Sequence, residues 1–241
     1  MIIPKQVEQE SRKMFLFLFA LMVAVLFGWQ AWQMMLTNFA YEEAKLDGFQ
    51  MGVVQAVREV PGLLSFLAVY LLLIAKEYRL ANFFVLVLGF GLLLVGWFPT
   101  FGGILFTAFV VSTGFHFYET MSQSMILQYF SYQTAPIVLG KLRGLSALAS
   151  IVAGIVVLIA STVMGYTSIY IMLGIVVICL WLVCFRMTPT RSDIAPQSRK
   201  LSFKKEYWPY YVMTVLCGIR RQFFIVFGLF LLVSKFGFSV Q

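Results

Sequence analysis

Long apolar blocks of membrane-crossing length are the feature that most constrains this chain. Each block approaches or exceeds the ~20 residues that a helix needs to cross the hydrocarbon core of a bilayer. The seven blocks cover residues 14–36, 51–75, 80–97, 102–128, 145–164, 168–185 and 208–233. Only 12% of the residues are charged, about half the share in ordinary globular domains. The sequence therefore predicts an all-α polytopic bundle of seven transmembrane helices with the lipid bilayer as its surroundings.

Basic residues lie almost entirely in alternate connections between these blocks. If the N-terminus is cytoplasmic, 13 of the 18 Lys and Arg residues fall on the cytoplasmic side, and only Lys45 and Lys235 fall on the other. Cytoplasmic connections of membrane proteins are enriched in Lys and Arg. We therefore predict a cytoplasmic N-terminus and a location in the plasma membrane, with the bacterial inner membrane as the expected one. The same distribution accounts for the net charge of +8 without a nucleic-acid partner.

Six ionisable side chains interrupt the apolar blocks: Arg58, Glu59, His116, Glu119, Arg220 and Arg221. A charge near the middle of a bilayer costs about 3 kcal/mol on insertion scales, so such residues usually face a cavity or a partner. Two alternatives stay open. Each long side chain can instead extend to the membrane surface, and His116 can be a hydrogen-bonded residue of the packed bundle.

The adjacent charges Arg58 and Glu59 lie in the outer half of the second block, shortly before Pro61 and Gly62. Neighbouring residues on a helix point about 100° apart. We therefore expect the two charges not to neutralise one another but to find partners on other helices, as candidates for an outer gate. Pro61 either forms a hinge or is a tolerated membrane proline.

Polar residues also share helix faces in the first and fourth blocks. His116 and Glu119 are three residues apart, as are Gln30 and Gln33, so each pair occupies one face. These four residues are candidates for substrate binding or coupling. Two aromatic neighbours join them as candidates, Trp29 and Tyr118.

The chain contains little that indicates an enzyme or a metalloprotein. One His and a single His-x-x-Glu cannot form a two-metal site without further ligands from other helices. The sequence contains no Gly-rich phosphate loop, paired-Cys motif or Ser-His-Asp set. Three cysteines, Cys179, Cys184 and Cys217, lie in apolar blocks and are predicted to be buried and unreactive. We expect no enzymatic activity, no metal and no cofactor.

A short internal repeat indicates how the chain is organised. Leu26-Phe-Gly28 and Leu216-Cys-Gly218 are each followed about twenty residues later by Gly-Phe, at residues 48–49 and 237–238. Parallel repeats of this kind occur in transporters. We therefore divide the chain into a six-helix unit (1–186), a basic cytoplasmic linker (187–206) and the first helix of a second unit (207–241).

This layout resembles the major facilitator superfamily (MFS) of secondary transporters, which has two six-span halves joined by a basic cytoplasmic loop. The segments "LDGFQMGVV" (46–54) and "GKLRGLSALASIVAGI" (140–155) are similar to the starts of the second and fifth spans in that family. Between the second and third spans the family has a motif of the form G-x-L-x-D-R-x-G-R-R. The segment "LLLIAKEYRL" (71–80) keeps basic residues at Lys76 and Arg79 but lacks the glycines and the aspartate.

The resemblance implies a transporter that moves a small organic solute by alternating access, with spans one, four and seven lining the cavity. Glu119 or Glu59, with His116, would carry a coupled proton. Arg220, Arg221 and Arg58 would hold an anionic group. The 241 residues would be the N-terminal half plus the seventh helix, inactive without a C-terminal half as partner. A non-transporting membrane partner or receptor built on the same bundle is the alternative.

Overall fold

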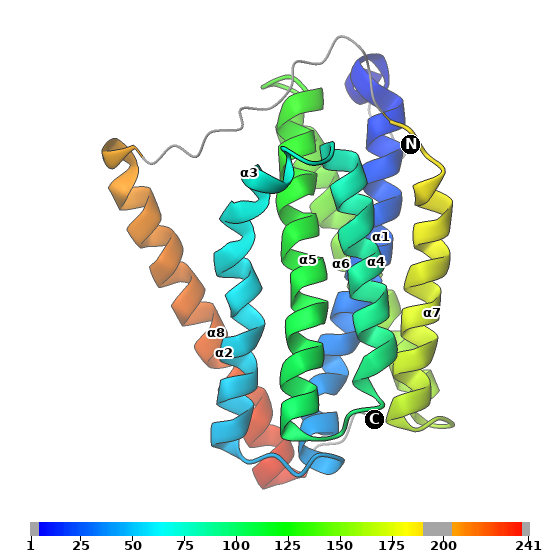
Figure 1. The fold of residues 1–241 in the computed structure, drawn as a ribbon, viewed down its shortest axis with the longest axis vertical. Coiled ribbons are helices and arrows are strands. Elements are labelled where there is room, and N and C mark those ends of the chain that lie inside the picture. The colour runs from blue at the N-terminus through cyan, green and yellow to red at the C-terminus, as the bar shows by residue number, and fades with distance from the viewer. Residues whose placement is uncertain (1–4, 190–203, 238–241) are drawn as a thin grey trace.

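The computed structural model describes residues 5–189 and 204–237, with side chains placed in 11–189, 204–217, 228 and 230–237. Most of the described chain is helical, and the long helices run side by side along one axis (Figure 1). They are α1 (Lys5–Glu42), α2 (Gly48–Leu64), α3 (Ala68–Leu71), α4 (Glu77–Val95), α5 (Phe101–Tyr129), α6 (Ala135–Ser161), α7 (Tyr166–Phe185) and α8 (Trp208–Phe236).

Six segments of the described chain are long and apolar enough to cross a membrane. They are Ser11–Glu42, Gly48–Leu71, Glu77–Val95, Phe101–Tyr129, Ala135–Ser161 and Tyr166–Phe185. The predicted all-α membrane bundle is therefore confirmed for the first six spans. The seventh span and the cytoplasmic N-terminus stay predictions. Helix α8 leans away from the other helices at its start and meets them near its end (Figure 1), where the Phe230 ring lies 6.3 Å from the Tyr41 ring.

Two helices extend beyond their apolar blocks. Helix α1 continues to Glu42, whose carboxylate accepts a hydrogen bond from Asn38 at 3.3 Å. Helix α6 begins at Ala135, about ten residues before the predicted start, with Pro136 in its first turn, where proline is tolerated. Basic residues lower the local hydropathy but are good helix formers, so the apolar pattern underestimates the helix. Arg143 consequently lies inside α6.

Helix α2 begins with a capping box, in which the Asp47 carboxylate accepts from the Gln50 N–H at 2.8 Å and the Gln50 side chain accepts from the Asp47 N–H at 3.1 Å. The helix passes Pro61 and ends at Leu64, where a short 3-10 helix, Ser65–Leu67, leads into α3. The single helix expected over 51–75 is thus interrupted. Pro61 has no N–H to donate to the preceding turn, and the regular helix ends one turn later.

Glycines allow the backbones of α4, α5 and α7 to approach closely. A Cβ on Gly114 of α5 would lie 2.6 Å from the Leu88 nitrogen and 2.7 Å from the Phe84 oxygen, both on α4. A Cβ on Gly174 of α7 would lie 2.9 Å from the Gly89 oxygen of α4. Small residues at helix contacts permit this packing in membranes. This side of the bundle is therefore closely packed.

The cysteines depart from the expected burial. Cys184 is buried, whereas Cys179 and Cys217 are exposed, so the prediction of three buried thiols is wrong for two of them. Lipid tails are as apolar as a protein core, so an apolar block in the sequence does not say which of its residues face inward.

Candidate functional site

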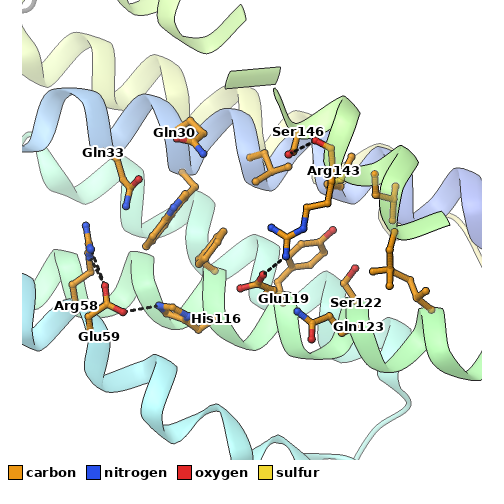
Figure 2. A pocket seen from close by; sticks show the side chains of 18 residues that line it. Gln30, Gln33, Arg58, Glu59, His116, Glu119, Ser122, Gln123, Arg143 and Ser146 are labelled. Atoms are coloured by element: carbon orange, nitrogen blue, oxygen red, sulfur yellow. Dashed lines mark hydrogen bonds and ion pairs between the residues drawn. The ribbon is translucent and has the colours of Figure 1, made fainter. Parts of the chain in front are cut away.

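A cavity of about 450 Å³ lies between α1, α2, α5 and α6 (Figure 2). Every predicted site residue with a described side chain lines it: Trp29, Gln30, Gln33, Arg58, Glu59, His116, Tyr118 and Glu119. The cavity also exposes polar groups that sequence reasoning did not select: Ser122, Gln123, Arg143 and Ser146. Residues from four helices, distant in sequence, thus meet in one polar chamber inside an apolar bundle.

Two predicted site residues cannot be assigned to this cavity. Arg220 and Arg221 belong to α8 by their backbone, but their side chains lie outside the described residues. Their predicted contact with an anionic solute stays a prediction.

Arg58 and Glu59 bond directly to one another, which corrects the expectation that each would pair with a different helix. Glu59 Oε1 lies 2.7 Å from Arg58 Nη2 and 3.2 Å from Arg58 Nε. Helical geometry separates the directions of the Cα–Cβ bonds, but both side chains are long and flexible enough to curve back together. The pair therefore neutralises itself locally.

The Arg58 guanidinium does not extend to the surface, because only 4% of its side chain is exposed. Its central carbon lies 5.9 Å from the centre of the Trp29 ring, a cation–π arrangement that favours a desolvated cation. The Ser112 hydroxyl donates to the Arg58 carbonyl and thereby connects α2 to α5. Arg58 is consequently a fixed part of the cavity wall.

His116 lies beside the second oxygen of the Glu59 carboxylate, with Nε2 4.0 Å from Glu59 Oε2 (Figure 2). Gly62 makes this position possible, because a Cβ there would lie 3.1–3.3 Å from three atoms of the imidazole ring. A protonated His116 would be attracted to Glu59, whereas a neutral one leaves the carboxylate to Arg58. This part of the cavity thus holds one carboxylate between a permanent and a titratable cation.

A second ion pair connects α5 to α6. Arg143 Nη2 lies 3.7 Å from Glu119 Oε1 (Figure 2). The two side chains are 76% and 37% exposed, so this pair is looser and more accessible than the one in α2. The prediction had placed Arg143 in a cytoplasmic connection; the extended α6 places it on the cavity. Pro136 was the sequence signal for an earlier helix start, because proline is tolerated in the first turn. That start would have placed Arg143 inside the helix.

Helix α1 and its aromatic contacts form the uncharged wall. The Trp29 ring stacks on Phe115 of α5 at 3.9 Å between centroids and 9° between planes. Gln30 and Gln33 add amides to the lining, whereas Trp32 is fully buried and lies outside the cavity. A flat apolar surface and hydrogen-bonding groups suit an organic solute.

The described lining contains two arginines, two glutamates and one histidine, so its permanent charges balance. Within 5–189 and 204–237, no group of three or more His, Cys, Asp or Glu side chains could hold a metal ion. The arrangement offers hydrogen-bonding, charged and aromatic groups to a small molecule.

Comparison with known proteins shows the fold. No protein-family model matches the sequence, and no curated protein matches it. Among solved structures, a bacterial homolog of the human lysosomal transporter Spinster, inward-facing and unoccupied, matches with a TM-score of 0.67 and 13% identity. The helices of this chain are thus arranged as in about half of that transporter. The match covers 94% of this chain and 56% of that one.

An auto-inhibited POT family peptide transporter also shares this arrangement of helices. It matches with a TM-score of 0.53 and 13% identity, over 91% of this chain and 51% of that one. This chain therefore spans about half the length of the transporters it matches. At this identity the resemblance concerns the arrangement of helices and not the solute.

Proposed function

We propose that the chain forms half of a secondary transporter that moves a small organic solute across a membrane by alternating access. One observation carries the proposal: a transporter half-fold encloses a polar, charged cavity of about 450 Å³. That volume falls in the range of about 300–1,000 Å³ found for small-molecule sites. Charged groups inside membrane proteins mark solute and proton pathways. The N-terminus is cytoplasmic in this proposal, and the membrane is the bacterial inner membrane.

The lining residues support distinct roles. Trp29 and Tyr118 contact the organic part of the solute, and Gln30 and Gln33 hydrogen-bond its polar groups. Arg58 and Glu59 form the outer gate on α2, where Glu59 faces His116 of α5. Two arginines of α8, Arg220 and Arg221, would attract an anionic group from the second half of the transporter.

Proton coupling is the second part of the proposal. Glu59 lies 2.7 Å from Arg58, and Glu119 lies 3.7 Å from Arg143. Protonation of either carboxylate would weaken its attraction to the neighbouring arginine. His116 lies on the same helix face as Glu119 and within reach of Glu59. A proton taken up here changes which ion pairs hold the helices together, which is how a gradient can drive alternating access.

The test is solute flux in proteoliposomes that contain the full-length protein, with and without a pH gradient. Wild-type protein should accumulate a member of a panel of organic anions, zwitterions and neutral solutes, and Glu119→Gln should abolish accumulation without loss of insertion. Lys141→Gln is the matched control, because Lys141 is exposed and does not line the cavity. Wild-type flux in Glu119→Gln would contradict the site, and absence of flux for the whole panel would favour a receptor or partner protein.

A further inference from the structure

The Glu119–Arg143 pair differs from the other ion pair of the cavity in ways that bear on binding. Its closest N···O distance is 3.7 Å, beyond hydrogen-bonding range, whereas Arg58 and Glu59 are 2.7 Å apart. The Arg143 side chain is 76% exposed, compared with 4% for Arg58. A loosely held, accessible guanidinium can exchange its carboxylate for another anion at little cost.

We infer that Arg143 is the anchor for a carboxylate group of the solute. Glu119 takes up a proton when that carboxylate binds Arg143. The inference rests on the proposed transport function and names the solute class of the same cavity. It assigns a binding role to a residue outside the set selected from the sequence.

The linkage follows from charge. A solute carboxylate on Arg143 replaces the Glu119 carboxylate as the partner of the guanidinium. Glu119 then faces a second carboxylate in place of a cation, and the repulsion between two like charges favours its protonated form. A proton from the solvent bonded to one Glu119 oxygen removes that charge and leaves a hydrogen-bond donor. The bound solute and the bound proton therefore stabilise one another.

Other charged groups around the cavity define the alternatives to be tested. From α2 the cavity receives Arg58 and Glu59, and from α5 it receives His116 and Tyr118 besides Glu119. The lining residues from α1 carry no charge. His116 is the competing proton acceptor, since an unperturbed imidazole titrates near pH 6.5.

The positions of the lining residues along the cavity fit a solute that carries a carboxylate on a flat ring. Arg143 and Ser146 lie on α6, while the stacked rings of Trp29 and Phe115 form another part of the same lining. Figure 2 shows the Glu119–Arg143 pair and the Arg58–Glu59 pair at different places along the cavity, with His116 between them. The guanidinium and the aromatic side chains thus line the same cavity of about 450 Å³, which has room for an aromatic carboxylate.

The experiment measures benzoate binding to the purified full-length protein by calorimetry between pH 6 and pH 8, where benzoate stays ionised. Benzamide is the uncharged probe of the same shape. Wild-type affinity for benzoate should rise as pH falls, by up to about tenfold per pH unit for one linked proton, and affinity for benzamide should not. Absence of benzoate binding by the wild type at pH 6 would overturn the inference.

Variants separate the anchor from the proton acceptor. Glu119→Gln mimics the protonated carboxyl, so benzoate should bind at pH 8 at least as tightly as it binds the wild type at pH 6, without pH dependence. Arg143→Gln should weaken benzoate at least tenfold, Arg143→Lys should retain part of the affinity because the charge remains, and Lys141→Gln should match the wild type. Equal losses of benzoate affinity in Arg143→Gln and Lys141→Gln would overturn the assignment of Arg143 as the anchor.

His116→Gln decides which group carries the linked proton. The pH dependence should persist in this variant and vanish in Glu119→Gln; the reverse result overturns the assignment. The outcome is independent of the transport proposal. If the wild type transports a neutral solute but does not bind benzoate, the proposed function stands and this inference is wrong. If benzoate and proton binding are linked but no solute is transported, this inference stands and the proposed function is wrong.

Discussion

Helix α5 has two contrasting faces. Toward α4, Gly114 brings two backbones so close that a Cβ would lie 2.6 Å from a backbone nitrogen. Toward the cavity, His116 and Glu119 project from the same helix into a chamber with polar and charged walls. Only a few residues separate the two faces. The side of α5 that faces α4 therefore contributes close packing, and the side that faces the cavity carries the ionisable side chains.

The largest loss of stability is expected from Gly114→Ala. Overpacking a core costs about 1–3 kcal/mol, and here the obstructing atoms are backbone, so α4 and α5 must separate. The melting temperature and the monodisperse yield in detergent should both fall. Gly140→Ala is the control, because nothing lies within 4 Å of a Cβ there and helix propensity alone should stabilise by up to about 1 kcal/mol. Equal melting temperatures for the two variants would remove the contrast between the faces.

A smaller loss is expected from Glu59→Gln, and a still smaller one from Arg58→Gln. The first change takes an anionic partner from a guanidinium that is 4% exposed, whereas the second takes a cation from a carboxylate that is 38% exposed. The cost of leaving a charge behind grows with its burial, and because Glu59 is 38% exposed this pair should cost less than the backbone clash at Gly114. Thermal unfolding of both variants checks the order, and a larger loss in Arg58→Gln would contradict it.

Gly62→Ala should change stability by less than about 1 kcal/mol, because better helix propensity offsets a tight contact. Its effect should appear at His116 instead, since a Cβ would meet the ring at 3.1–3.3 Å. The imidazole should move relative to Glu59, and the NMR titration curve of His116 should shift from that of the wild type. Gly52→Ala on the same helix, with nothing within 4 Å, should leave that curve unchanged.

Glu119→Gln should have the smallest effect on stability, within about 0.5 kcal/mol, because its ion pair is loose and exposed. The same substitution should abolish solute accumulation. A stable, inserted and inactive variant is the outcome that separates the two faces most clearly. A variant that loses both flux and melting temperature would show that the cavity face also holds the fold together.

Much of the bundle could be predicted because the bilayer imposes helix length on the sequence. Six apolar blocks correspond to six described membrane-length segments. Charges in apolar surroundings are costly, and that argument selected residues of α2 and α5 that gather in one cavity. The D-x-x-Q pattern at Asp47 and Gln50 also carries a capping signal that the apolar pattern alone does not use.

Other features depended on tertiary structure. The position of Arg143 required the true start of α6, which a hydropathy pattern places too late because Lys141 and Arg143 interrupt it. The direct bond between Arg58 and Glu59 required side-chain conformations that helix geometry does not fix. Exposure of Cys179 and Cys217 could not be read from composition, since a lipid-facing side chain and a core side chain are equally apolar.

The close contact at Gly114 has a mechanical consequence for the cavity. Helix α5 is clamped to α4, and α4 in turn lies against α7 through Gly89 and Gly174. No such glycine contact lies within 4 Å at Gly140 or Gly144 of α6, and α2 gives way to a 3-10 turn after Pro61. Helix α5 is therefore the fixed wall of the chamber, to which α2 is joined by the Ser112–Arg58 hydrogen bond and α6 by the loose Glu119–Arg143 pair. The connection to α6 depends on charge, so a proton on Glu119 would loosen it and leave the connection to α2 in place.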